Sequence, residues 1–388
     1  MPDTRRVRLC MKDLYQQDLV EMIERETRNF EIFAIGTPSH PDFLPAYNLL
    51  LDEFGPEGGM ERLESVRGFL LEDPYEPQPG GTYMRYFMLV AKNTRGELLG
   101  ARDGVLLYNA EYDGELMVVF LSHIVMKEQA RGTVLSYWLR IAPVELAVTY
   151  VAELAAMGKI TLPLPDQPGK HFGMKLNLAA EMEYFTPEEP LSLQRILFYG
   201  RGGFDVVNPR YFPYKQPDFR EPEVIRATGN QPVPFMMLLR RMGRERQATI
   251  PTTEAAAVMK LLYDDFATYC LPEFIGDQRQ LVLDRLSERE LRGQVELLPL
   301  PTGPRDIHRL RPIFRYNVFK KYYPNEPDTL AYLSSGIEQK VRKNPRYVDE
   351  EIARLAEELE MRERWVYPAR DKDYDWMRRA GSLVKKRR

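Results

Sequence analysis

LMVVFLSHIVMKEQARGTV, residues 116–134, decides the fold of this chain. Its apolar first part predicts a β-strand over 116–126. A long apolar helix is expected next, from Val134 to Met157, with Pro143 as a kink or break and Gly158 as its stop. The turn between strand and helix therefore lies at a helix N-terminus, where free backbone amides can bind the negative charges of a diphosphate.

The segments on either side of this stretch predict a sheet. Apolar runs over 86–91 and 98–108, separated by a turn at 93–96, indicate two strands that continue into 116–126 as an antiparallel meander. This order is typical of a mixed α/β fold, in which a mostly antiparallel central sheet is flanked by helices. The elements expected downstream are a strand over 176–185, a helix over 191–199 and strands over 204–207 and 234–239.

Composition divides the chain into three regions. A proline-rich and glycine-rich connector, 74–81, precedes the predicted sheet. From Thr252 onward, the sequence shows repeated signals for the start of a helix. The helices expected there cover about 276–294, 305–321, 328–343 and 348–364. We therefore predict an N-terminal segment of helices and strand over 1–82, a core over 83–248, and a mainly helical C-terminal region with a basic tail over 249–388.

A second glycine-rich motif, Tyr199-Gly200-Arg201-Gly202-Gly203-Phe204, follows the helix expected over 191–199. In order and separation, this motif and the turn Gln129-Ala130-Arg131-Gly132-Thr133-Val134 resemble the two signatures of the GNAT superfamily of acyl-CoA-dependent N-acyltransferases. The turn departs from the family pattern at Val134, where a small residue is usual. The resemblance covers about residues 84–240 and implies a GNAT-like sheet split at its centre, with acyl-CoA in the split.

The resemblance also implies where the donor, acetyl-CoA or another acyl-CoA, would bind. Backbone groups of Ile124, Val125 and Met126, at the end of the central strand, would contact the pantetheine amides, and Asn177 on the next strand could contribute. The turn and the helix start would hold the diphosphate. The residues implied there are Gln129, Arg131, Gly132, Thr133, Val134, Leu135 and Ser136.

By the same resemblance, Tyr199 is the candidate general acid, because a phenol with a pKa of about 10 can protonate a departing thiolate. The acceptor amine must lose a proton, and His123 is the histidine of the predicted core with a pKa in the useful range. Strand alternation would place His123 on one sheet face with Leu121 and Val125, so a structural role stays open. The rival bases are Glu183, Glu181 and, more weakly, Asp103.

Composition limits the expected partners. The net charge of −3 argues against binding to nucleic acid or to an anionic membrane. Cys10 and Cys270 are the only cysteines, and their spacing predicts neither a disulfide framework nor a zinc site, so no metal is expected. The sequence shows no signal-peptide pattern and no membrane-spanning run, which favours a cytoplasmic protein; a homodimer is left open.

The predicted activity is direct N-acyl transfer, with acetyl-CoA as the favoured donor. An amine of a small molecule or of a protein would attack the thioester in a ternary complex, as in N-acetyltransferases. One alternative is a longer acyl chain, for which segments 159–175 and 208–219 could shape a tunnel. The other is a non-catalytic GNAT-like module, whose C-terminal region would bind or assemble with partners.

Overall fold

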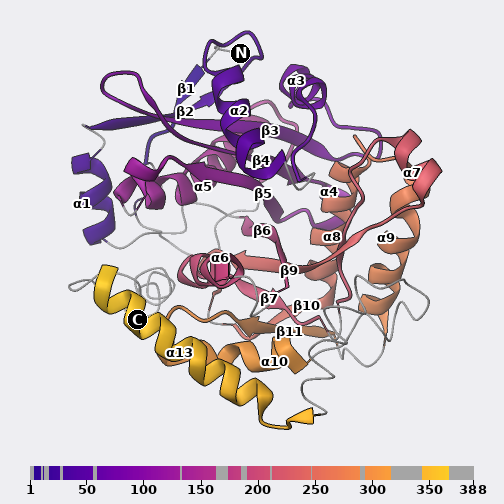
Figure 1. The fold of residues 1–388 in the computed structure, drawn as a ribbon. Helices are drawn as coiled ribbons and strands as arrows, with labels where there is room; N and C mark the ends of the chain where they lie inside the picture. The colour runs from indigo at the N-terminus through magenta and orange to yellow at the C-terminus, as the bar shows by residue number, and fades with distance from the viewer. Residues whose placement is uncertain are drawn as a thin grey trace, which may run out of the picture. The chain divides into compact units, whose positions relative to one another are not determined.

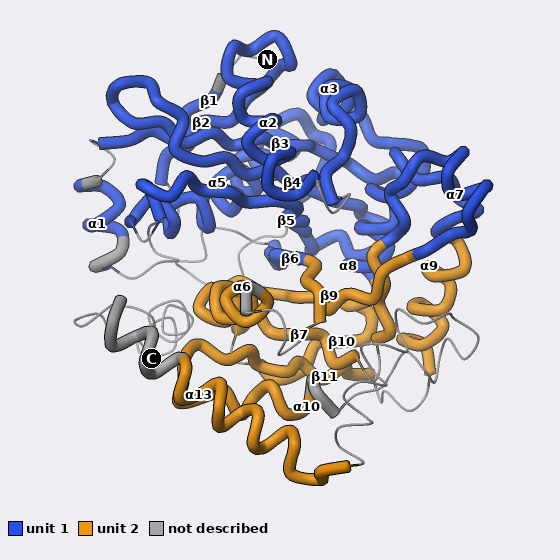
Figure 2. The backbone as a smooth tube through the Cα atoms, viewed as in Figure 1, with its two compact units in different colours: residues 1–180, 217–231, 257–275 blue, residues 181–216, 232–256, 276–388 orange. Residues whose placement is uncertain are grey.

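The computed structural model describes residues 4–9, 12, 17–26, 29–55, 59–131, 133–162, 174–184, 190–209, 212–245, 247–288, 293–315 and 343–366. The chain forms two compact units, each assembled from separate stretches of sequence (Figure 2). The first unit comprises residues 1–180, 217–231 and 257–275, and the second comprises 181–216, 232–256 and 276–388. The boundaries near residues 83 and 249 that composition suggests stay a prediction.

The first unit contains a mixed sheet with the strand order β1-β2-β3-β4-β5-β6 (Figure 1). Neighbouring strands are antiparallel except for β5 and β6, which are parallel. This arrangement confirms the predicted class, a mostly antiparallel sheet flanked by helices. The strands are β1 (Thr4–Arg6), β2 (Phe30–Ile35), β3 (Tyr83–Asn93), β4 (Leu98–Tyr108), β5 (Leu116–Met126) and β6 (Lys175–Glu183), whose last three residues belong to the second unit.

Helices cover both faces of this sheet. Ala101 of β4 packs in one core cluster with Phe43 and Leu50 of helix α2 (Phe43–Phe54). The neighbouring Gly100 faces the other way, because a Cβ atom there would lie 3.3 Å from Leu139 of α5 (Val134–Ala156). The other helices of this unit are α1 (Gln17–Glu26), α3 (Leu63–Leu71), α4 (Ala110–Asp113), α7 (Pro222–Thr228), a 3-10 turn η3 (Glu128–Ala130) and most of α8 (Thr252–Phe266).

The helix α5 follows the predicted range closely. It continues through Pro143 from Val134 to Ala156, so the chain does not break at the proline. It ends where Gly158 adopts a positive φ of 69°, a conformation that glycine reaches without steric cost. Apolar side chains are buried along most of the helix, which anchors its N-terminus firmly beside the end of β5.

β5 carries a bulge that changes which side chains share a face. Arg102 pairs with Ile124 and Gly104 pairs with Leu121, so Ser122 and His123 together oppose the single residue Asp103. The extra residue shifts by one position the alternation of β5 side chains between the two faces of the sheet. The expectation that Leu121 shares a face with His123 is therefore wrong.

The second unit contains an antiparallel sheet in the order β9-β7-β11-β10, with β8 paired to β9. The sequence predicts a helix up to residue 294, but α9 ends at Ser287 and a strand follows at 294–299. That strand alternates buried Val295 and exposed Glu296, a signal too short to stand out from the surrounding helices. The strands are β7 (Asp205–Val207), β8 (Lys215–Gln216), β9 (Val233–Arg241), β10 (Thr249–Pro251) and β11 (Gln294–Pro299).

Helices of the second unit lie mostly toward the C-terminus of the chain. They are α6 (Pro190–Arg201), most of α9 (Pro272–Ser287), the 3-10 turn η5 (Pro304–Arg309), α10 (Leu310–Arg315) and α13 (Tyr347–Val366). The helix expected over 328–343 and the basic tail lie outside the described residues, apart from Lys343. Among the described helices, none combines the length and the apolar character needed to cross a membrane.

Candidate functional site

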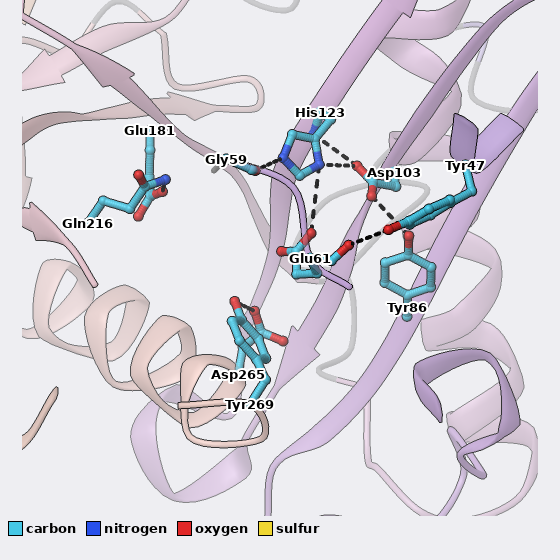
Figure 3. Close-up of polar contacts among 10 residues, drawn as sticks. All are labelled: Tyr47, Gly59, Glu61, Tyr86, Asp103, His123, Glu181, Gln216, Asp265 and Tyr269. Atoms are coloured by element: carbon cyan, nitrogen blue, oxygen red, sulfur yellow. Dashed lines mark hydrogen bonds and ion pairs between the residues drawn. The ribbon is translucent and has the colours of Figure 1, made fainter. Parts of the chain in front are cut away.

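Asp103 and His123 form a buried pair on the first unit's sheet (Figure 3). The carboxylate of Asp103 accepts from the backbone N–H of His123 at 2.9 Å and from its ring Nδ1 at 3.0 Å. Its second oxygen accepts from the hydroxyl of Tyr86 at 2.9 Å. The bulge in β5 makes this possible, because it brings the backbone and the ring of one residue to the same carboxylate.

The ring of His123 is held in its protonated form. Its Nε2 atom lies 2.6 Å from the carbonyl oxygen of Gly59, so both ring nitrogens face acceptors and both must donate. Burial opposes the charge, but Asp103, Glu61 and the Gly59 carbonyl outweigh it and raise the pKa of His123 to about 9. A general base needs a free lone pair, and this arrangement gives the imidazole none.

Glu61 is the third member of the cluster and lies in the segment between α2 and α3. Its Oε2 atom is 4.0 Å from Nδ1 of His123. That oxygen is buried and has no hydrogen-bond partner among the residues that the structure describes. Burial raises the pKa of Glu61 above its ordinary value, while the positive charge of His123 opposes the shift. Glu61 is thus a desolvated carboxylate whose proton affinity is increased.

Three ligand atoms of Glu61, Asp103 and His123 lie within 4.8 Å of one another, a spacing that would fit a metal ion. A metal-bound histidine must present a lone pair, so it coordinates as neutral imidazole. Here both ring nitrogens donate, to Asp103 and to Gly59. The donor set in this arrangement therefore fits a proton better than a metal.

A small pocket, with an accessible interior of only about 20 Å³, lies beside this cluster. It belongs wholly to the first unit, and Glu61 connects it to the His123–Asp103 pair. Figure 3 shows Glu61 between that pair and the side chains of Asp265 and Tyr269. The lining residues are Glu61, Phe69, Glu72, Met84, Tyr86, Gly104, Val105, Ser122, Asp265, Thr268 and Tyr269.

The residues expected to contact pantetheine, Ile124, Val125 and Met126, form the end of β5. The parallel ladder between β5 and β6 covers Leu116–Phe120, and β5 then continues to Met126 paired with β4. In the described part of the first unit, the β6 side of this strand end has no ladder partner. Such an edge leaves backbone groups available to a ligand that runs along it.

The turn that is predicted to bind the diphosphate follows directly after the end of β5. Gln129 lies in η3, and Arg131 donates from Nε to the carbonyl oxygen of Met126 at 3.1 Å. Thr133 is the N-cap of α5, but its hydroxyl donates to the carbonyl of Ala130 at 2.7 Å instead of accepting from the helix. The side chain of Thr133 therefore does not cap the first amides of α5. Gly132, which the sequence places at the centre of this turn, lies outside the described residues.

The other residues predicted to bind acyl-CoA lie at the start of α5 and on β6. Val134 and Ser136 lie in the first turn of α5, and the Ser136 hydroxyl donates to the carbonyl of Thr133 at 2.8 Å. Leu135 is buried, so its side chain belongs to the core and only its backbone could meet a ligand. Asn177 is buried on β6 opposite Val118, within the paired part of the ladder and not beyond its end.

Tyr199 belongs to the second unit, near the end of α6. It is half-buried, with its ring edge-to-face against Phe198 and Phe204 at centroid distances of 5.4 and 5.3 Å. The glycines after it end the helix: Gly203 has a φ of 79°, and the amide of Phe204 donates to the carbonyl of Tyr199 at 3.1 Å. The motif thus has a clear structural function, and the catalytic role of Tyr199 stays a prediction.

The rival bases on β6 are already engaged within the second unit. Glu183 forms an ion pair with Arg195. Glu181 accepts from the amide of Gln216 at 2.8 Å. These two carboxylates and Tyr199 belong to the second unit, whereas His123 belongs to the first.

Glu61 has only a weak signal in the sequence. It lies just after Gly58-Gly59-Met60, in a turn that interrupts a helical pattern, and turns carry no periodic signal. An acidic residue two positions after a glycine pair was the signal available, because loops often carry functional side chains. Its neighbour His123 is more than 60 residues away in the sequence, so only the fold brings the two together.

No protein-family model matches the chain, and no curated protein matches it. One similar solved structure is described as the "putative acyl-CoA N-acyltransferase from Klebsiella pneumoniae subsp. pneumoniae MGH 78578", with 13% identity, a TM-score of 0.24, and coverage of 55% of this chain and 99% of that one. Another is nourseothricin acetyltransferase, with 16% identity, a TM-score of 0.20, and coverage of 40% and 65%.

Proposed function

We propose that the protein is an acyl-CoA-dependent N-acyltransferase that moves an acyl group, with acetyl as the first candidate, directly to an amine. The main support is the course of β5. Its ladder with β6 ends at Phe120, yet the strand continues to Met126 and leads through a short turn into the uncapped N-terminus of α5.

This course would suit an acyl-CoA in two ways. The open edge of β5 after Phe120 offers backbone hydrogen bonds to the amides of pantetheine. The first turn of α5, which Thr133 does not cap, offers backbone N–H groups and a positive partial charge to the diphosphate. The two features follow each other along one segment, in the order that a single extended ligand would need.

Glu61 is the proposed general base. It lines the pocket beside β5, and its raised pKa makes it a stronger proton acceptor than an exposed carboxylate. His123 and Asp103 would position Glu61 and neutralise part of the local charge. In the step itself, the amine nitrogen bonds to the thioester carbonyl carbon, Glu61 takes the proton from nitrogen, and the carbon–sulfur bond breaks.

The thiolate of CoA must then be protonated, and Tyr199 is the proposed acid on the basis of the sequence resemblance alone. Glu183 is a less favoured base because of its ion pair with Arg195.

Isothermal titration of the full chain with acetyl-CoA, octanoyl-CoA and free CoA tests the proposal. Micromolar binding of at least one acyl-CoA is expected, and the tighter of the two acyl chains identifies the donor class. Free CoA tests whether the acyl group itself contributes. If none of the three binds, the enzyme proposal fails and a non-catalytic module takes its place.

A further inference from the structure

The segment that carries Glu61 is held by its backbone, at two carbonyl groups that are two residues apart (Figure 3). The carbonyl oxygen of Gly59 lies 2.6 Å from Nε2 of His123, and the carbonyl oxygen of Glu61 accepts from the hydroxyl of Tyr47 at 3.0 Å. The amide of Gly59 donates to the carbonyl of Phe54, the last residue of α2, at 3.1 Å. Both β5 and α2 therefore fix the position of this segment.

The carboxylate of Glu61 has no comparable contact at its buried oxygen. Oε2 makes no hydrogen bond among the residues that the structure describes, and its distance of 4.0 Å from Nδ1 of His123 is too long for one. That ring nitrogen donates to Asp103 instead. The place of this oxygen therefore depends on the hydrogen bonds that hold the backbone of the segment.

Tyr47 is suited to hold a backbone group in a fixed place. It lies in the middle of α2, and its ring is buried in one core cluster with Phe43 and Leu50. Burial raises the pKa of its phenol, and the carboxylates of Glu64 and Glu61 raise it further. The hydroxyl therefore stays protonated at neutral pH and remains a hydrogen-bond donor.

We propose that Tyr47 is a positioning residue for proton transfer, whose hydroxyl holds the backbone of Glu61 so that the carboxylate stays beside the pocket and the His123–Asp103 pair. This proposal rests on the proposed role of Glu61 as the general base. Tyr47 acts only through Glu61 and contacts neither the donor nor the acceptor. Loss of its hydroxyl should therefore slow proton transfer and leave the binding of acyl-CoA, proposed for β5 and α5, unchanged.

The protonation of Glu61 reports on its position. Burial is the largest cause of its raised pKa and Asp103 adds to it, while the charge of His123 lowers it. A looser segment would admit water to the carboxylate, and because burial contributes most, the pKa should fall towards its ordinary value. The other titratable groups that face Glu61 from α2, from β3 and around the pocket are Tyr47, Tyr86, Glu72, Asp265 and Tyr269.

Tyr47→Phe tests the proposal, because it removes the hydroxyl and keeps the ring in the core. With butylamine as a model acceptor, kcat for the release of CoA from acetyl-CoA should fall about three- to tenfold. Isothermal titration should show unchanged affinity for acetyl-CoA. The matched control is Tyr108→Phe, which removes another buried hydroxyl that donates to a backbone carbonyl, that of Gly114 at 3.2 Å. Its kcat should be unchanged.

A double variant tests whether Tyr47 acts through Glu61. When Tyr47→Phe is added to Glu61→Gln, kcat should equal that of Glu61→Gln alone, because no base is left to position. A further fall as large as that in Tyr47→Phe alone would assign the effect to the fold and overturn the proposal. Thermal unfolding of each variant measures stability separately.

A second measurement does not require activity. Carbon-13 NMR of the full chain, labelled at the glutamate carboxyl groups, follows the titration of Glu61, and Glu61→Gln identifies its signal by its absence. The titration midpoint should be lower in Tyr47→Phe than in the unaltered protein, and unchanged in Tyr108→Phe. An equal midpoint in Tyr47→Phe overturns the proposal, also where butylamine is not accepted.

The outcomes separate the two proposals. A lowered midpoint in a protein that does not bind acyl-CoA supports the hold of Tyr47 on Glu61 and rejects the proposed activity. Acyl-CoA binding with an equal midpoint in Tyr47→Phe overturns the positioning role and leaves the proposed activity standing. A lowered midpoint with unchanged kcat also overturns the role, because the position of the carboxylate would then not affect the rate.

Discussion

The Nδ1 atom of His123 lies 3.0 Å from Oδ1 of Asp103, and both side chains are buried on the same sheet. The pair joins a positive and a negative charge that neither solvent nor another ion compensates fully. Its integrity therefore controls both the stability of the first unit and the charge beside the pocket.

Removing the charge of His123 should destabilise the protein strongly. In His123→Gln, the carboxylate of Asp103 loses its buried counter-charge, and we expect a loss of about 3 to 5 kcal/mol in the free energy of unfolding. Urea unfolding followed by circular dichroism measures it. The exposed His308→Gln is the matched control and should change stability by less than about 0.5 kcal/mol. A double variant with Asp103→Asn should recover part of the loss; no recovery would mean that the two side chains act separately.

Stability should fall as pH rises from neutral. The pKa of His123 is raised from 6.5 to about 9 on folding, so its contribution is fully present below pH 6.5 and is lost as pH rises through about 9. The loss is of order 3 kcal/mol. Glu61 also has a raised pKa, and its effect has the same sign but begins above its ordinary value of 4.5. Urea unfolding at pH 6, 7, 8 and 9 measures the slope, which should flatten in His123→Gln; an equal slope there would assign it to other groups.

A negative charge at the start of α5 should block the donor without harming the helix. Ser136→Asp places a carboxylate in the first turn, where it stabilises the helix dipole by about 0.3 to 1 kcal/mol but repels a diphosphate. Titration with acetyl-CoA should show at least about tenfold weaker binding, while the melting temperature is unchanged or higher. Thr253→Asp makes the same change at the start of α8 and should leave binding intact. Unchanged affinity in Ser136→Asp would place the diphosphate elsewhere.

Glu61→Gln should separate proton transfer from donor binding. The amide keeps the size of the side chain but cannot accept the proton, so we expect kcat to fall about 10²- to 10⁴-fold with acyl-CoA affinity nearly unchanged. Steady-state kinetics with an amine acceptor measure it, with Glu64→Gln as the control. A fall in kcat no larger than in the control would remove Glu61 from the base role.

Tyr199→Phe should lower kcat and leave acyl-CoA affinity nearly unchanged, if its hydroxyl protonates the thiolate. The ring contacts with Phe198 and Phe204 do not involve the hydroxyl, so the fold should be retained. Kinetics and titration on the same preparation measure both quantities. Equal loss of binding and turnover would indicate that Tyr199 is structural.

The strands of the first unit's sheet could be predicted because their apolar runs are long. The ranges 98–108 and 116–126 match the observed bounds, and α5 follows in place. The strand at 294–299 was not predicted, because six residues between helical segments carry too little periodicity. Local pattern therefore identified the sheet of the first unit better than that of the second.

The site was less predictable than the fold. His123 stood out as a histidine in a core strand, but its protonated state depends on Asp103 and Gly59, which the fold brings from other segments. Strand alternation alone put Leu121 on the wrong face, since a bulge leaves no mark in the apolar pattern. Glu61 lay in a turn without periodicity. Candidate residues could be chosen from the sequence by their type. Their protonation state, and the face of the sheet on which they lie, depended on tertiary contacts.

The bulge in β5 makes strand length, and not only residue type, a condition for this site. Ser122 lines the pocket and His123 pairs with Asp103 because both residues face the same side of the sheet. A deletion of one residue here would restore regular alternation, so that two consecutive residues could no longer both face this side of the sheet. Homologous chains that keep the chemistry should therefore tolerate substitutions along β5 more readily than a single insertion or deletion.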